Sequence, residues 1–79
     1  TQLGDPWMYK KDVYNALLSQ AETDRFQALT SLKIMLDFPA GIGDHSTSDL
    51  HNNLNEALSK LADADDRIET LKRYQSELF

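Results

Sequence analysis

The chain has 79 residues and no cysteine, and its 13 acidic against 8 basic side chains give a net charge of −5. This length allows one domain, and contents of 41 % hydrophobic and 27 % charged residues are those of a folded globular chain rather than a disordered one. Because the basic residues form no patch and no apolar run approaches the roughly 18 residues of a membrane span, we expect no nucleic acid partner, no membrane partner and a cytoplasmic location.

The first expected helix covers about residues 6–37. Asp5-Pro6 is a favourable start, because the Asp side chain can accept free N–H groups and Pro at the first helical position has none to leave unpaired. A start near Lys10, with the residues before it extended, is the alternative. Apolar residues then recur at the spacing of an amphipathic helix, with Lys11 and Arg25 in the two gaps. They are Trp7, Tyr14, Leu18, Ala21, Ala28, Leu32 and Met35.

A loop is expected over residues 38–46. Pro39 disfavours helical geometry at the residue before it, and Gly41 and Gly43 permit positive φ angles. Ser46 followed three residues later by Asp49 resembles a capping box, which starts a new helix.

The second expected helix covers about residues 47–78 and has a cleaner pattern than the first. Its apolar positions alternate four-three along the whole length, which is the heptad repeat of a left-handed coiled-coil seam. They are Leu50, Leu54, Ala57, Leu61, Ala64, Ile68, Leu71 and Leu78, with Gln75 as the one polar member.

Folding the chain back at the glycines brings the two apolar stripes together when paired residue numbers sum to about 86. Small residues then meet at Ala21/Ala64 and polar residues at Lys11/Gln75, while Arg25 can lay its stem on Leu61 and reach Asp65 or Asp66. Further layers are Leu36/Leu50, Leu32/Leu54, Ala28 or Leu29/Ala57, Leu18/Ile68, Tyr14/Leu71 and Trp7/Leu78. The sequence therefore predicts an all-α fold, a long antiparallel two-helix hairpin that forms one domain over residues 1–79.

One seam leaves much apolar surface uncovered, and chains this short usually need a disulfide, a metal or a partner to be stable. Without cysteine, we expect a homodimer in which two hairpins form a four-helix bundle. The residues expected in protein interfaces are Trp7, Tyr14, Leu17, Phe26, Leu29, Leu58 and Tyr74. The Trp7-Met8-Tyr9 segment can alternatively cap the open end against Leu78 and Phe79.

No arrangement of residues suggests catalysis, so we expect a non-enzymatic structural or adaptor protein without a cofactor. Asp63, Asp65, Asp66 and Glu69 are interpreted as a solvated charged face, because the inward Glu-x-x-His pairs of di-iron bundles are missing. The alternative function is metal or anion binding by the Gly41–Thr47 loop. The candidate metal ligands there are Asp44, His45 and Asp49.

The segment Leu36-Asp37-Phe38-Pro39-Ala40-Gly41-Ile42-Gly43-Asp44-His45 and the later run 61–68 resemble small proteins of large tailed bacteriophages, notably those of marine cyanobacteria. The resemblance extends over about residues 32–74, and the Pro-x-Gly-Ile-Gly-Asp-His motif carries most of it. It implies a viral origin, a place in the host-cell cytoplasm and no catalytic residues.

Overall fold

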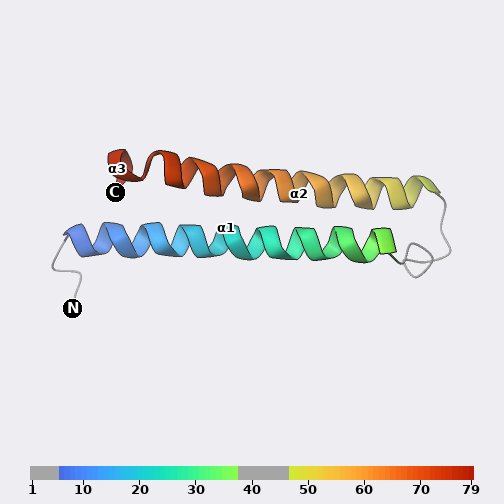
Figure 1. Cartoon of the computed structure of the whole chain (residues 1–79), viewed down its shortest axis with the longest axis horizontal. Helices are drawn as coiled ribbons and strands as arrows, with labels where there is room; N and C mark the ends of the chain where they lie inside the picture. The colour runs from blue at the N-terminus through green and yellow to red at the C-terminus, as the bar shows by residue number, and fades with distance from the viewer. Residues whose placement is uncertain (1–5, 38–46) are drawn as a thin grey trace.

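The computed structural model describes residues 6–37 and 47–79, with side chains from Tyr9 in the first helix and from Asp49 in the second. Two long helices, α1 (Pro6–Asp37) and α2 (Thr47–Arg73), run antiparallel and side by side, and the short helix α3 (Gln75–Leu78) follows (Figure 1). The described ranges contain no strand. The predicted all-α hairpin is therefore confirmed. The candidate caps and hinges Asp5, Gly41, Gly43 and Ser46 lie outside the described residues.

The molecule is a flat ribbon of two helices, with extents of 56 × 25 × 15 Å. Its radius of gyration is 17.6 Å, whereas a compact chain of this length is expected to have about 12 Å. Two helices side by side leave two broad faces, one on each side of the seam (Figure 1). The first turn of α1 and the C-terminus at Phe79 lie at the same end of the ribbon (Figure 1).

Small residues fill the middle of the seam. Ala21 and Ala64 have no exposed surface, and Ala28 and Ala57 are also buried. Both residues of the predicted layers Ala21/Ala64 and Ala28/Ala57 are therefore buried. Ala28 rather than Leu29 is the buried residue opposite Ala57. Alanine allows two helices to approach closely, but it contributes little apolar area. The remaining buried apolar residues of the described chain are Tyr14 and Ile68.

One predicted layer is wrong at the connection end of the seam. Leu36 was expected opposite Leu50, but its side chain is 65 % exposed. Met35, which lies one heptad after Ala28, is half-buried instead. A helix turns about 100° per residue, so only one of these two neighbours can point at the partner helix.

The second helix ends earlier than the sequence predicts. Tyr74 leaves helical geometry with φ −105° and ψ 15°, and α3 begins at the next residue. The break changes the direction of the chain, so that the Phe79 ring packs edge-on against Tyr14 with centroids 5.2 Å apart. Leu78, expected inside opposite Trp7, is exposed. Its predicted place in the seam is therefore wrong, and the Trp7 side chain is outside the described set.

No helix within the described residues is both long enough and apolar enough to span a membrane.

Candidate functional site

Two ion pairs between the helices identify the two broad faces. Arg67 of α2 donates to the Asp24 carboxylate of α1 at 2.6 Å. Arg25, the next residue of α1, lies with its guanidinium 3.9 Å from the carboxylate of Asp65. Successive residues of a helix are rotated by about 100°, so Asp24 and Arg25 point to opposite sides of the seam. The two ion pairs therefore bridge the helices on opposite faces.

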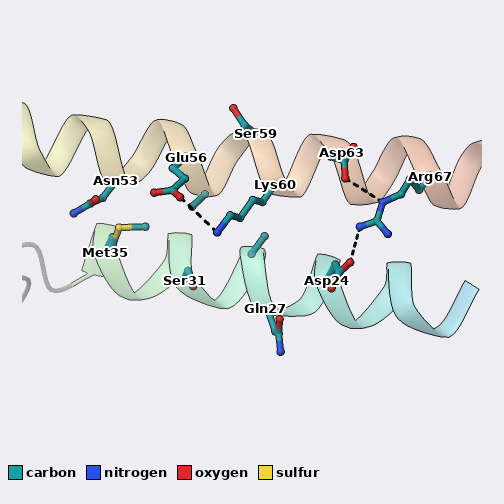
Figure 2. Close-up of a pocket in the computed structure, with 12 residues that line it drawn as sticks. Asp24, Gln27, Ser31, Met35, Asn53, Glu56, Ser59, Lys60, Asp63 and Arg67 are labelled. Atoms are coloured by element: carbon teal, nitrogen blue, oxygen red, sulfur yellow. Dashed lines mark hydrogen bonds and ion pairs between the residues drawn. The ribbon is translucent and has the colours of Figure 1, made fainter. Parts of the chain in front are cut away.

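The face that carries the Asp24–Arg67 pair is polar, and we call it the polar face. A shallow groove of about 760 Å³ runs along it between the helices. Lys60 and Arg67 extend from α2 toward α1, while Ser59 points away (Figure 2). The groove is lined by Asp24, Gln27, Ala28, Ser31, Met35, Asn53, Glu56, Ala57, Ser59, Lys60, Asp63 and Arg67.

Arg67 is the centre of a small ionic network. Besides Asp24, it donates from Nε to the carboxylate of Asp63 at 3.0 Å, and Gln20 donates to Asp24 at 3.0 Å. The hydrogen bonds from Arg67 and Gln20 lower the pKa of Asp24, and the hydrogen bond to Asp24 raises the pKa of Arg67. Both side chains are therefore held in their charged forms, and each helix is fixed against the other at this height.

The cations that line the polar groove all lie in ion pairs. Lys60 lies 3.6 Å from Glu56, and Arg67 is bound by two carboxylates (Figure 2).

The candidate metal ligands are not brought together in the part of the chain that the structure describes. That part contains no group of three or more potential metal ligands. Asp49 lies exposed in the first turn of α2, whereas Asp44 and His45 lie outside the described residues. The predicted loop site therefore stays a prediction.

A second cavity, of about 470 Å³, lies at the end of the ribbon near the termini. Lys11 and Gln75 both line it, which places the predicted polar pair at one location. Tyr14 and Phe79 form its apolar wall. The cavity lies beside the short helix α3, whose following residue Phe79 contacts Tyr14.

The face that carries the Arg25–Asp65 pair is apolar in the half nearest the α1–α2 connection. Leu29 lies one turn from Arg25 and Leu58 lies one heptad from Asp65, so both share this face with the ion pair. Phe26, which is 70 % exposed, lies at its outer edge, and Leu36 is one heptad beyond Leu29. We call this surface the leucine face. It consists of exposed Phe26, Leu29, Leu36 and Leu58 above half-buried Leu32, Leu54 and Leu61.

The residues predicted for interfaces are divided among three places. Phe26, Leu29 and Leu58 belong to the leucine face. Leu17 and Tyr74 are exposed one heptad from Asp24 and Arg67, and so lie on the polar face. Tyr14 is buried in the seam and Trp7 is not among the described side chains. Ile34, which is 51 % exposed and lies one heptad after Gln27, also falls on the polar face, so exposed apolar side chains occur on both faces.

Sequence reasoning found the Arg25–Asp65 pair but missed the pair between Asp24 and Arg67. The acidic residues around Arg67, namely Asp63, Asp65, Asp66 and Glu69, were interpreted as a solvated charged face, and no partner was expected for Arg67. Arg67 comes one residue before Ile68, and Asp24 comes one residue before Arg25. These two positions were the available signal that the side chains could lie on the same side of the seam. Only the actual register of the two helices shows that these side chains meet.

Comparisons with known proteins add no relative. No protein-family model, no curated protein and no solved structure matches this chain. The resemblance to phage proteins therefore stays a prediction, and function has to be argued from the two faces of the hairpin.

Proposed function

We propose that this chain is a small non-enzymatic interaction protein that acts through its helical surface and assembles as a homodimeric four-helix bundle. The observation that carries the proposal is the leucine face. Contiguous exposed apolar side chains of this kind are typical of protein interaction sites on small soluble chains. The opposite face presents paired charges along its groove, and Leu17 and Tyr74 are exposed there as well.

The thin core of the hairpin supports the same proposal. Four of the six buried apolar residues in the described chain are alanines, and no large side chain there is fully buried. The chain exposes 5972 Å², about 1,100 Å² more than the roughly 4,900 Å² expected for a compact monomer of its mass. An excess of that order is what an elongated ribbon of these dimensions exposes, and it leaves surface available to a partner.

Two matched variants test the proposal. Leu58 on the leucine face and Leu17 on the polar face are 54 % and 48 % exposed. Leu58→Glu places a charge in each half of a symmetric interface and should weaken dimerisation about 100-fold or more. Leu17→Glu adds the same charge outside the interface and should leave the dimer intact. Sedimentation equilibrium measures both, and circular dichroism checks that both variants remain helical.

The proposal fails if the wild-type chain is a well-folded monomer at micromolar concentrations. It also fails if Leu17→Glu and Leu58→Glu weaken self-association equally, because the leucine face would then have no special part.

The wider biological setting is proposed on the sequence resemblance alone. The Pro-x-Gly-Ile-Gly-Asp-His motif supports a viral origin, which would place the protein's contacts in the cytoplasm of an infected cell. Affinity capture from infected cells tests this: phage or host proteins should be retained by the wild-type chain and lost with Leu58→Glu.

A further inference from the structure

We propose that the cavity beside α3, which we call the end cavity, binds a small organic anion that carries a carboxylate on an aromatic body. Its volume of about 470 Å³ lies within the roughly 300–1,000 Å³ that small-molecule sites occupy. The leucine face lies in the half of the ribbon nearest the α1–α2 connection, and the end cavity lies at the opposite end (Figure 1). The proposal therefore does not depend on the proposed homodimer.

Both charged side chains that line the end cavity are lysines. Lys11 comes from α1 and Lys72 from α2, and no acidic side chain of the described residues lines this cavity. The two lysines thus form a locally positive site on a chain whose net charge is −5. An anionic ligand is attracted by both ammonium groups, whereas a metal cation would find no carboxylate ligand there.

The charge of Lys72 is not neutralised by any described residue. Glu69 is the only acidic side chain three or four positions from Lys72 along the helix, the spacing at which helical side chains meet. It pairs instead with Arg73 at 3.3 Å, and the Arg73 guanidinium also lies 6.0 Å from the centroid of the Tyr74 ring. Within the described part of the chain Lys72 forms no ion pair. Its ammonium group is therefore available to a ligand.

Two aromatic rings give the end cavity its apolar wall. The ring of Phe79 packs edge-on against Tyr14, with centroids 5.2 Å apart and an angle of 66° between the planes. Tyr14 is buried, whereas Phe79 is half-buried and keeps exposed ring surface. A flat aromatic ligand can pack on that surface. The side-chain amides of Asn15 and Gln75 also line the cavity and can donate hydrogen bonds to a carboxylate.

This combination favours an aromatic carboxylate over other small ligands. An inorganic anion would contact the lysines but leave the aromatic wall in water. A neutral aromatic molecule would cover the wall but give Lys72 no counter-charge. Because lysine binds an anion as a compact point charge rather than through a planar fork, an aromatic sulfonate should be accepted as well.

Titration of the whole chain with 2-naphthoate, followed by heteronuclear NMR, tests the proposal. The shifts should be centred on the amides of Asn15 and Gln75, with a Kd of about 1 mM or tighter. Its neutral analogue 2-naphthamide should bind about 3- to 10-fold more weakly, because it lacks the charge that the lysines attract. Acetate, which has the charge without the aromatic body, should produce no saturable shifts.

Two matched variants locate the site. Lys72→Gln should weaken 2-naphthoate binding about 3- to 10-fold, because one of the two lining charges is removed. Lys33→Gln makes the same change of charge at an exposed position of α1 that does not line the end cavity, and should leave the affinity unchanged. Lys72→Arg keeps the charge and should retain binding. Circular dichroism checks that all three variants remain helical.

Localised shifts that weaken only with Lys72→Gln support the proposal. No saturable binding up to about 10 mM 2-naphthoate overturns it, as does equal affinity for 2-naphthamide or an equal loss in the Lys33→Gln and Lys72→Gln variants. Shifts centred on Leu29 and Leu58 would mean adsorption to the leucine face and would also overturn it. None of these results alters the sedimentation test of Leu58→Glu, so the proposed homodimer is decided separately.

Discussion

At the scale of single residues, the seam depends on alanines. Ala21 and Ala64 are fully enclosed where the two helices meet, so no space exists there for a larger side chain. This makes the middle of the hairpin sensitive to added volume rather than to lost volume. Each alanine contributes by letting the two helices approach closely, so that other side chains, including the half-buried leucines on either side, can pack across the seam.

Replacing Ala64 with leucine should therefore destabilise the protein by about 1–3 kcal/mol, because an overpacked seam forces the helices apart. Ala62→Leu is the matched control, since Ala62 is exposed on the same helix and its change should stay within about 0.5 kcal/mol. Urea unfolding at one protein concentration measures both. Equal effects of the two substitutions would show that Ala64 is not enclosed.

The ion pair between Asp24 and Arg67 predicts an acid-dependent contribution to stability. Because the fold lowers the pKa of Asp24 from its ordinary 3.8, the stabilisation is fully present above that value and is lost as pH falls through the lowered pKa. Asp24→Asn should reduce the urea midpoint at pH 7, and the difference from wild type should disappear in strong acid. Asp66→Asn removes an exposed carboxylate on α2 as a control. A difference between Asp24→Asn and wild type that persists in acid would contradict this origin.

At the scale of the elements, the accuracy of sequence reasoning followed the quality of the apolar pattern. In α2 the heptads are regular and its flanks are polar, so Ala57, Ala64 and Ile68 were placed in the seam correctly. In α1 apolar residues lie on several sides, so the pattern alone could not separate Met35 from Leu36. The two faces were unpredictable for the same reason, because they depend on the rotation of α1.

The end of α2 could not be read from the sequence at all. No Gly or Pro marks Tyr74, and residues 75–78 continue the heptad. The break is accompanied by the contact of Phe79 with Tyr14, which lies more than 60 positions away in the chain. A tertiary contact of this kind is invisible to local pattern and can outweigh helix propensity.

That aromatic contact should be measurable as a coupling. A double-mutant cycle with Tyr14→Leu and Phe79→Leu is expected to give about 0.5–1.5 kcal/mol, the range of edge-on aromatic pairs. Leu78→Ala next to it should change stability by no more than about 0.5 kcal/mol, because Leu78 is exposed. A coupling of zero would mean that Phe79 is not docked on α1.

At the scale of the whole molecule, the hairpin is a ribbon with unequal faces. Its buried interior in the described residues is small, and four of the six buried apolar side chains are alanines. If a second copy covers the leucine face, association adds to the stability of the folded hairpin.

The thermal midpoint should therefore rise with protein concentration, because mass action favours the folded dimer. For Leu58→Glu the midpoint should be lower and independent of concentration, whereas Leu17→Glu should follow the wild type. Differential scanning calorimetry over a wide concentration range provides the measurement. A concentration-independent wild-type midpoint would indicate that the hairpin is stable alone.

The first turn of α1 and the C-terminus lie at one end of the ribbon (Figure 1), and this has a mechanical consequence. A force that pulls the termini apart acts across the seam rather than along it, so it opens the hairpin one layer at a time. The Tyr14–Phe79 contact would part first, then the ion pairs at Arg67 and Arg25, and the connection end last. A molecule loaded in this way peels open gradually at low force, whereas a force applied along the helices would have to slide every layer at once.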